Sequence, residues 1–224
     1  MGLKLHNMRT EMKENNPREF IPEPVLRRLP WYLAYVNMLR DKNVENVSST
    51  NISRELNVDA SQIAKDLSFL NIKGKTRIGY DVASLEEELS DFLGFSRSHN
   101  AVIFGAGSLG AALMQDSGLS NYGLNVVAGF DINPKLIGSS VCGVPVYSID
   151  ELDSRCRRLH AEIGIITVPV DHAQDAADML ISAGVKGLWN FTPVRIRVAD
   201  GIVIANTSIY AHLAVMYNRL DNLL

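Results

Sequence analysis

Apolar residues recur at helical spacing in the first third of the chain and form short continuous runs in the rest. Between Val25 and Leu39 they recur every three or four positions, which predicts a helix with one buried face. Pro30 should either kink this helix or mark its first turn. The first part of the chain is therefore predicted to be a helical domain.

Two shorter helical patterns follow in the same region. The first is VSSTNISREL (47–56), in which Ser48 or Ser49 can cap a short helix. The second is ASQIAKDLSFL (60–70), where Asp59 as N-cap and Gln62 three residues later resemble a capping box. Two short helices joined by a tight turn have the geometry of a helix-turn-helix, whose second helix enters the major groove of DNA.

A cation-bearing ribbon is predicted directly after these helices. In NIKGKTRIGYDV (71–82), Gly74 and Gly79 bracket a short basic tip, and apolar residues alternate beyond it as far as Val82. A ribbon after a helix-turn-helix is the winged-helix arrangement, in which the wing touches phosphate or the neighbouring minor groove.

Most of the affinity for DNA would come from basic residues, because phosphate neutralisation dominates the strength of such complexes. The recognition helix itself is only weakly basic. The candidate DNA-binding residues are Arg27, Arg28, Ser49, Ser61, Gln62, Lys65, Lys73, Lys75, Arg77 and Tyr80. Small helical units with a hairpin also serve as protein-interaction modules, so that alternative stays open on these residues alone.

The second part of the chain begins with a glycine-rich turn. The apolar run AVIF (101–104) suits a buried parallel strand, and Gly105-x-Gly107-x-x-Gly110 follows at once. The first glycine permits the tight turn, the second lets backbone approach a pyrophosphate, and the third lets the helix pack on the strand. Amides at the start of the helix then face the phosphates. This pattern predicts a dinucleotide site, and the alternative is a glycine-rich turn in a fold without nucleotide.

An acidic residue supports the dinucleotide interpretation. The apolar run LNVVAGFD (124–131) ends in Asp131, 21 residues beyond Gly110. A carboxylate at this position hydrogen-bonds the adenosine ribose hydroxyls and repels a 2′-phosphate. NAD(H) is therefore favoured over NADP(H).

Further strands and helices continue a doubly wound fold. Strands are predicted at EIGIITVP (162–169), VKGLWNFTP (185–193) and IVIAN (202–206). Helices are predicted at SIDELDSRCRRL (148–159), where Ser148 and Glu151 suggest a capping box, and at DHAQDAADMLISAG (171–184).

Loops at the strand ends face the cofactor crevice in this fold. The candidate cofactor-binding residues are Gly105, Ala106, Gly107, Ser108, Leu109, Gly110, Asp131, Ile132, Thr167, Val168, Pro169, Asn190, Phe191 and Thr192.

The closing stretch SIYAHLAVMYNRLDNLL (208–224) predicts an apolar-rich helix. Leu213, Met216 (or Val215), Leu220 and Leu223 can form one stripe on it. A single helix at the end of a domain has little to pack on within the chain. A partner subunit is the natural place for this stripe, so a homodimer is expected.

Composition narrows the class of protein. No apolar run approaches the roughly 20 residues needed to span a bilayer, and the polar N-terminus has no secretory signal core. Two cysteines among 224 residues are too few for a disulfide framework and lack metal-ligand spacing. The expectation is a cytoplasmic protein with neither membrane nor metal as a partner.

No set of catalytic residues is predicted. The five histidines have no serine, cysteine or carboxylate partner at suggestive spacing in the sequence, and no HExxH motif occurs. A dehydrogenase also needs a substrate domain, whereas everything after the glycine-rich turn completes the nucleotide fold. A dinucleotide site without chemistry indicates a sensor rather than an enzyme, and a sensor fused to a DNA-binding domain indicates a transcription factor.

The predicted fold class is α/β, with a winged-helix domain followed by a Rossmann-type doubly wound parallel sheet. The predicted parts are a flexible tail at 1–19, the winged-helix DNA-binding domain at 20–90, a linker at 91–99, the Rossmann NAD(H)-binding domain at 100–206 and a dimerisation helix at 207–224.

In combination these segments resemble the Rex family of redox-sensing transcriptional repressors, over nearly everything from Ile21 to the C-terminus. The most specific segments are RLPWY (28–32), GKTRIGYDV (74–82), FGAGSLGAAL (104–113) and AGVKGLWNFTP (183–193). The resemblance implies a homodimer that binds an AT-rich inverted repeat as apo or NAD⁺ protein and is released by NADH, the favoured effector. It also implies that the C-terminal helix is exchanged between subunits.

Three sites depart from the pattern of that family. Ala64 and Lys65 stand where the recognition helix usually carries two basic residues, the first an arginine. Ser208 stands where the family usually has an aspartate that takes part in the NADH-linked switch, and Asp116 where a tyrosine is common. These departures concern operator preference and the coupling between cofactor and DNA, and the NAD site itself matches the family.

Two other classes of protein remain as alternatives. One is a small NAD-dependent oxidoreductase with an accessory helical domain. The other is a nucleotide- or CoA-responsive interaction module that never touches DNA.

Overall fold

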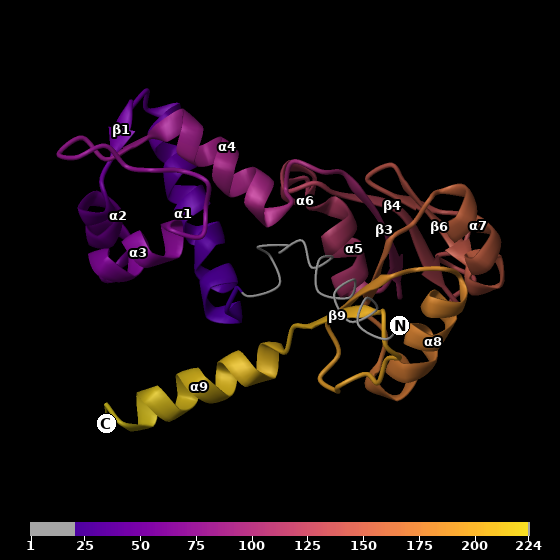
Figure 1. The fold of residues 1–224 in the computed structure, drawn as a ribbon. Coiled ribbons are helices and arrows are strands. Elements are labelled where there is room, and N and C mark those ends of the chain that lie inside the picture. The colour runs from indigo at the N-terminus through magenta and orange to yellow at the C-terminus, as the bar shows by residue number, and fades with distance from the viewer. Residues whose placement is uncertain (1–20, 224) are drawn as a thin grey trace, which may run out of the picture. The chain divides into compact units, whose positions relative to one another are not determined.

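The computed structural model describes residues 21–223 and divides into two compact units, whose boundary lies between Ser96 and Arg97 (Figure 1). Each unit has its own hydrophobic core. The tail predicted at 1–19 lies outside the described residues.

The N-terminal unit contains helices and two short strands. In chain order these are α1 (Glu23–Asp41), β1 (Asn46–Val47), α2 (Ser49–Leu56), α3 (Ala60–Leu67), β2 (Tyr80–Asp81) and α4 (Val82–Leu93). All four helices bury apolar side chains in one core, to which α1 contributes Val25, Leu29, Leu33 and Val36 at helical spacing. The predicted first helix is confirmed, and Pro30 lies inside it rather than at its first turn.

Helices α2 and α3 form the predicted helix-turn-helix. Ser48 caps α2 in a reciprocal capping box with Asn51, and Asp59 caps α3 by accepting hydrogen bonds from backbone N–H groups of the first turn. The capping box predicted for α3 is wrong in its second half. The side-chain amide of Gln62 does not reach back to Asp59, because it donates to Asp66 instead, with Nε2 at 2.7 Å from Oδ1.

The ribbon after α3 is shorter than predicted. Lys75 and Gly79 exchange backbone hydrogen bonds of 2.7 and 2.8 Å around the basic tip. Beyond it, β2 pairs antiparallel with β1, a strand that the sequence pattern did not predict. The alternation expected as far as Val82 ends early, because Asp81 caps α4 by accepting a hydrogen bond of 2.8 Å from the backbone N–H of Ser84.

The predicted linker is also shorter than expected. Helix α4 was not predicted and continues to Leu93, and the first strand of the second unit begins at His99. The connection is therefore 94–98 rather than 91–99.

The C-terminal unit alternates strands and helices. Its elements are β3 (His99–Phe104), α5 (Ser108–Gln115), α6 (Gly118–Asn121), β4 (Leu124–Asp131), β5 (Ser140–Val141), β6 (Val144–Ser148), α7 (Leu152–Arg158), β7 (Ile163–Ile166), α8 (Ala173–Ser182), β8 (Gly187–Asn190), β9 (Val203–Asn206) and α9 (Ile209–Asp221). One sheet runs in the order β5-β6-β4-β3-β7-β8-β9, antiparallel only between β5 and β6. Numbered along the chain, its six parallel strands run 3-2-1-4-5-6, the Rossmann order, so the predicted doubly wound sheet is confirmed.

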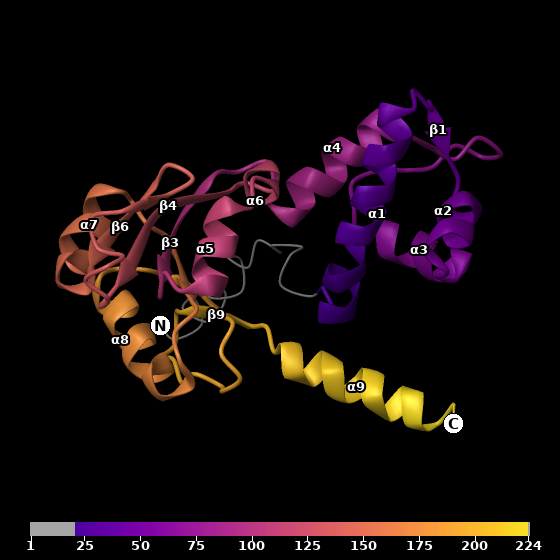
Figure 2. The same ribbon diagram turned by 180° about the vertical axis from the view of Figure 1, so that it is seen from behind.

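Both faces of this sheet are covered. Side chains alternate along the central strand β3: Ala101 and Ile103 enter one core, and Val102 and Phe104 enter the other. Helix α5 contributes to the first core, and α7 and α8 contribute to the second (Figures 1 and 2). Strands buried on both faces explain the short, continuous apolar runs of this half of the sequence.

The capping box predicted between Ser148 and Glu151 does not form. Ser148 caps a short 3-10 turn by accepting a hydrogen bond of 3.3 Å from the backbone N–H of Asp150. The carboxylate of Glu151 pairs with Arg155 one helical turn further on, at 2.7 Å. The i, i+4 ion pair thus replaces the reciprocal hydrogen bond that the sequence suggested.

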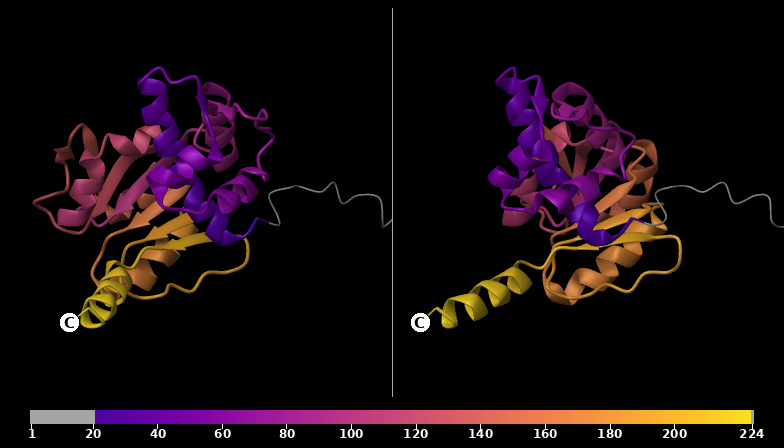
Figure 3. Two further views of the ribbon diagram at one scale, coloured as in Figure 1. Left: turned by 90° about the vertical axis from the view of Figure 1, so that its left-hand side faces the viewer. Right: turned by 60° about the vertical axis from the view of Figure 1, so that its left-hand side comes forward.

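Helix α9 projects from the sheet and has no buried residue (Figure 3). Its exposed apolar side chains include Val215, Met216, Tyr217 and Leu220. No helix in the described residues, α9 included, is long and apolar enough to cross a membrane.

The two cysteines are expected to differ sharply in reactivity. Cys156 lies on the buried face of α7 and is 2% exposed, and burial raises the pKa of its thiol to about 11. Cys142 is exposed at the tip of the β5–β6 hairpin. Because the thiolate is the reactive form, a thiol reagent at pH 8 should modify Cys142 quickly and Cys156 only after denaturation. Mass mapping of the modified peptides checks this; rapid labelling of Cys156 in the native protein would contradict it.

Candidate functional site

A pocket of about 330 Å³ opens at the carboxyl ends of β3, β4 and β7. This edge of the sheet lies where the strand order reverses, between β3 and β7, the position at which ligands bind in open α/β sheets. Its walls are Phe104, Gly105, Gly107, Phe130, Asp131, Ile132, Ile149, Thr167, Val168, Pro169, His172, Asp175, Ala176 and Met179.

The glycine-rich turn between β3 and α5 is built as the spacing predicts. A Cβ atom on Gly110 would lie 2.1 Å from the carbonyl oxygen of Gly105, so only glycine allows this close packing of helix and turn. A Cβ atom on Gly107 would meet no atom within 4 Å. Gly107 therefore leaves open space beside the backbone at the start of α5, where a phosphate can approach the helix N-terminus.

Asp131 closes the pocket at the end of β4. Its carboxylate accepts hydrogen bonds from the backbone N–H of Ala106 (2.7 Å) and of Asn133 (2.8 Å). These two bonds fix the carboxylate beside the glycine-rich turn. The acidic group stands where the sequence placed the partner of an adenosine ribose.

NADH is expected to bind much more tightly than NADPH. The 2′-phosphate of NADPH would lie against the Asp131 carboxylate, and juxtaposition of like charges costs on the order of 3 kcal/mol, or roughly 100-fold in affinity. Fluorescence titrations of NADH and NADPH at low salt measure the ratio of the two affinities. The variant Asp131→Asn should bring the two affinities closer together. Equal affinities for the wild-type chain would contradict this assignment of Asp131.

The strand ends on the other side of the pocket are held by hydrogen bonds. The hydroxyl of Thr167 donates to the carbonyl oxygen of Gly105 at 2.7 Å, which ties the end of β7 to the glycine-rich turn. Asn190 is fully buried. Its side-chain nitrogen donates hydrogen bonds to the backbone oxygen of Val194 and to Oδ1 of Asn206, and its Oδ1 accepts from the backbone N–H and the hydroxyl of Thr192. The geometry gives Asn190 a structural role in holding β8, β9 and the loop between them.

The pocket unites seven of the residues predicted from the sequence. They are Gly105, Gly107, Asp131, Ile132, Thr167, Val168 and Pro169. The other predicted residues do not line it. Ala106, Gly110, Asn190 and Thr192 are buried, Ser108 and Leu109 begin α5, and Phe191 packs on Trp189 with ring centroids 4.7 Å apart.

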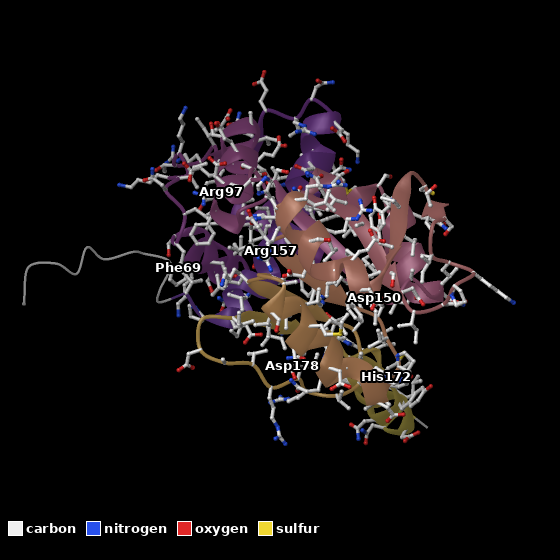
Figure 4. All side chains as sticks on the ribbon, turned by 90° about the vertical axis from the view of Figure 1, so that its right-hand side faces the viewer. Phe69, Arg97, Asp150, Arg157, His172 and Asp178 are labelled. Atoms are coloured by element: carbon white, nitrogen blue, oxygen red, sulfur yellow. The ribbon has the colours of Figure 1, made fainter. Side chains whose placement is uncertain are left out.

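Sequence reasoning missed one wall of the pocket. Asp175, Ala176 and Met179 of α8, with His172 directly before the helix, line this wall; Figure 4 labels His172. The spacing of three, one and three residues marks one face of a helix that follows a strand end, and this signal could have identified the wall.

The exposed face of α3 is the candidate DNA-reading surface. Ser61, Ala64, Lys65 and Ser68 are exposed, and Ile63, Asp66 and Leu67 are buried. Gln62 lies at the border between the two faces. The predicted contacts Ser61 and Lys65 thus share the outward face, and Ser49 begins α2 in a partly buried position.

The wing carries exposed cations. Lys73, Lys75 and Arg77 are exposed, and none of them takes part in an ion pair within residues 21–223. Tyr80 lies at the base of the wing, partly buried, in β2. Three exposed cations around one tight hairpin suit contacts to a phosphate backbone.

The two neighbouring arginines of α1 have different surroundings. Arg27 is exposed and pairs with Glu23 one turn earlier, at 2.6 Å. Arg28 reaches the fully buried carboxylate of Asp66 in α3, with Nε at 2.7 Å from Oδ2 and Nη2 at 2.8 Å from Oδ1. Asp66 compensates the charge of Arg28, so Arg28 has a structural partner within the unit, and its contact with phosphate stays a prediction.

The pKa of Asp66 is set by two opposing effects. Burial raises it, and hydrogen bonds from Arg28, Tyr32 and Gln62 lower it and win, so the pKa lies below its usual value. The hydrogen bond to Asp66 raises the pKa of Arg28, and burial, followed by the hydrogen bond to Asp66, raises the pKa of Tyr32. The carboxylate is therefore charged at neutral pH.

The N-terminal unit is expected to lose stability in acid. A carboxyl whose pKa is lower in the folded than in the unfolded state stabilises the fold above the unfolded value of about 3.9. That contribution disappears as the pH falls through the folded pKa. Urea unfolding measured from pH 6 down to pH 3 should show this loss of unfolding free energy, and the loss should be smaller in Asp66→Asn. The comparison with this variant is needed because the pKa values of Asp59 and Asp81 are also lowered and contribute to the loss. Identical pH profiles for the two proteins would contradict the assignment.

Comparisons with known proteins match both units. A family described as the putative DNA-binding protein N-terminus matches residues 20–68, and the CoA binding domain matches residues 96–194. The redox-sensing transcriptional repressor Rex of Bacteroides fragilis is 54% identical, over 90% of this chain and 91% of the relative. The Rex proteins of Porphyromonas gingivalis (54%, covering 91% and 93%) and Treponema denticola (38%, covering 87% and 94%) are also similar. The chain belongs to the Rex family of redox-sensing transcriptional repressors.

Solved structures agree with this family. The crystal structure of RSP in complex with β-NAD⁺ and operator DNA matches with a TM-score of 0.86 at 35% identity, over 90% of this chain and 93% of that one. RSP with β-NADH matches with a TM-score of 0.81, over 91% and 95%. RSP is described as a Rex-family repressor. The resemblance found in the sequence is confirmed, and the oxidoreductase alternative is not favoured.

Proposed function

We propose that this protein binds operator DNA through its winged-helix unit as a homodimer and is released from it when NADH enters the pocket of its Rossmann unit. The observation that carries the proposal is that one chain holds both parts: a pocket with an open glycine-rich turn and Asp131, and a helix-turn-helix with a cationic wing. The relative RSP has been solved with β-NAD⁺ and operator DNA together, which supports the pairing of the two activities.

The homodimer is supported by α9. A 13-residue helix with no buried residue and with exposed Val215, Met216, Tyr217 and Leu220 leaves apolar area in water that a second copy can cover. We propose that α9 is exchanged between two subunits. Two identical recognition helices then read two half-sites of an inverted repeat, one helical turn or a multiple of it apart. The family resemblance implies that this repeat is AT-rich.

Ser208 has a local role that bears on this helix. Its hydroxyl caps α9 by accepting a hydrogen bond of 3.2 Å from the backbone N–H of Ala211. Aspartate and serine cap helices about equally well. The serine of this chain therefore preserves the start of α9, although it lacks the charge that the family usually places there.

The switch requires a difference in affinity between two arrangements of the dimer, since a ligand that binds both equally shifts nothing. The pocket supplies a basis for the difference. Val168 and Pro169 form an apolar wall next to the glycine-rich turn. Burial of a cationic nicotinamide against such a wall is costlier than burial of the neutral reduced ring, so the reduced form is the stronger ligand.

The proposal is tested by the reciprocity of binding. If NADH weakens DNA binding by a given factor, DNA must weaken NADH binding by the same factor, typically 5- to 150-fold for about 1–3 kcal/mol of coupling. Fluorescence titration of NADH into free protein and into protein saturated with operator duplex measures the two dissociation constants. Weaker NADH binding to the DNA complex is expected, and equal constants would contradict the switch.

A further inference from the structure

The carboxylate of Asp66 has four hydrogen-bond donors around it. Oδ1 accepts from Nη2 of Arg28 (2.8 Å) and Nε2 of Gln62 (2.7 Å), and Oδ2 accepts from Nε of Arg28 and Oη of Tyr32 (both 2.7 Å). Asp66 is 0% exposed. An ionised carboxylate has about four lone-pair positions, so this set of donors is complete.

This arrangement fixes which way the amide of Gln62 faces. The oxygen and nitrogen of a carboxamide are usually hard to tell apart, and the network must decide between them. An ionised carboxylate only accepts hydrogen bonds. The nitrogen of Gln62 must therefore face Asp66, which leaves the carbonyl oxygen and the second N–H for another partner.

Gln62 is also in the right place for such a partner. It is the third residue of α3 and lies at the border of the exposed face that holds Ser61 and Lys65. Recognition helices contact base edges with the residues of their N-terminal part. Its amide edge presents one acceptor and one donor, which complement the N6 donor and N7 acceptor of adenine in the major groove.

We propose that Gln62 reads an adenine in each operator half-site and that Asp66 is the positioning residue that holds its amide in the reading orientation. This inference rests on the proposed function. The other residues on the outward face of α3 are Ser61, Ala64, Lys65 and Ser68, so Gln62 is the side chain there that can form two hydrogen bonds with one base. Guanine presents only acceptors at the corresponding positions and satisfies only one of the two groups of the amide.

The first step of the test is selection of duplexes from a random library by the full-length wild-type protein at about 50 mM salt. Each adenine of the selected half-site is then replaced by 7-deazaadenine, which lacks the N7 acceptor and leaves the pairing with thymine intact. For the wild-type chain, one position in each half-site should lose about 5- to 100-fold in affinity, because the amide N–H of Gln62 is left without its acceptor at a cost of about 1–3 kcal/mol.

The variants separate reading from stability. Gln62→Met keeps the length of the side chain and removes its polar groups, so its affinities for the adenine and 7-deazaadenine duplexes should be equal at that position. Tyr32→Phe is the matched control: it removes one donor to Asp66 and keeps the bond from Gln62, so it should retain the wild-type ratio even with a lower melting temperature.

Asp66→Asn tests the positioning role, because it places an amide beside the amide of Gln62. The ratio of affinities for the adenine and 7-deazaadenine duplexes should fall well below the wild-type value. A cooperative unfolding transition shows that the variant is folded. Should this variant not fold, Gln62→Asn asks the same question, because its shorter side chain cannot reach Asp66 and a base together; it too should lose the ratio.

Two outcomes would overturn the proposal, and a third would overturn the proposed function on which it rests. If Gln62→Met keeps the wild-type ratio of affinities for the adenine and 7-deazaadenine duplexes at every position, Gln62 does not read adenine. If folded Asp66→Asn keeps that ratio, Asp66 does not position Gln62. Both leave NADH-controlled DNA binding in place. Failure of the wild-type protein to select any duplex at low salt would instead contradict the proposed function.

Discussion

Replacement of Gly107 by valine is expected to abolish NAD(H) binding and to leave the fold intact. The backbone of Gly107 is extended, with φ of −66° and ψ of −165°, a conformation open to any residue. Its missing Cβ would meet no protein atom within 4 Å, so the side chain of valine would enter the space in front of the α5 N-terminus. A pyrophosphate needs that space to reach the backbone amides.

The expected loss of affinity is large. Two charge-assisted hydrogen bonds from backbone N–H groups to phosphate contribute about 1.5–3 kcal/mol each. Their loss reduces affinity by on the order of 100-fold or more, whereas exchange of glycine at an N-cap position costs the fold only about 1 kcal/mol. In the repressor this variant should stay on DNA at NADH concentrations that release the wild type.

The measurement is calorimetric titration of NADH together with thermal unfolding by circular dichroism. Gly110→Ala is the contrasting variant, because its Cβ would lie 2.1 Å from a backbone oxygen and should lower the melting temperature of the unit. Wild-type NADH affinity in Gly107→Val would contradict the placement of the pyrophosphate, and with it the assignment of the pocket.

The second large effect is expected on the free energy of unfolding of Arg28→Met, compared with Arg27→Met, in which the adjacent arginine is replaced. Loss of Arg28 leaves the fully buried carboxylate of Asp66 without two of its four hydrogen bonds and without its compensating charge. Removing one partner of a buried ion pair typically costs about 3–5 kcal/mol. Part of the guanidinium is exposed, so we expect a value near the lower end, about 3 kcal/mol.

Arg27→Met provides the matched control. The pair of Arg27 with Glu23 has both side chains more than two-thirds exposed, and such pairs contribute about 0–1 kcal/mol. The same two variants separate DNA contact from stability. Loss of a phosphate contact lowers the slope of log affinity against log salt by about one, which is expected for Arg27 if it touches DNA.

Urea unfolding of both variants and of the wild-type chain measures the difference. A loss for Arg28→Met of less than about 1 kcal/mol, equal to that of Arg27→Met, would contradict the structural role of the Arg28–Asp66 pair. Unfolding that begins in the N-terminal unit, with the NADH affinity of the Rossmann unit unchanged, would place the effect where the structure locates it.

Local patterns in the sequence were enough to predict most of the fold. The apolar run at 124–131 that ends in Asp131 coincides with strand β4. The glycine spacing predicted the β3–α5 turn for steric reasons that the structure reproduces at Gly110. The apolar run and the glycine spacing each depend on one local effect, burial or steric fit, and such patterns predict the positions of strands and turns correctly.

Predictions failed where two partners compete for one side chain. Gln62 and Glu151 both had the spacing of a capping box, and both bond elsewhere: Gln62 to Asp66 one turn along α3, and Glu151 to Arg155. Asp66 and Arg28 are 38 residues apart, so neither could be predicted from local spacing to be the other's partner. The wall of the pocket on α8 was missed because it joins the site only through the winding of the sheet.

The most direct test of the whole account is fluorescence anisotropy of a labelled duplex, selected by this protein, titrated at fixed salt without cofactor, with NAD⁺ and with NADH. The account predicts tight binding in the first two titrations and release, as a shift of the midpoint to higher protein concentration, in the third. Binding that NADH leaves unchanged would contradict the central claim that the pocket of the Rossmann unit controls the winged-helix unit.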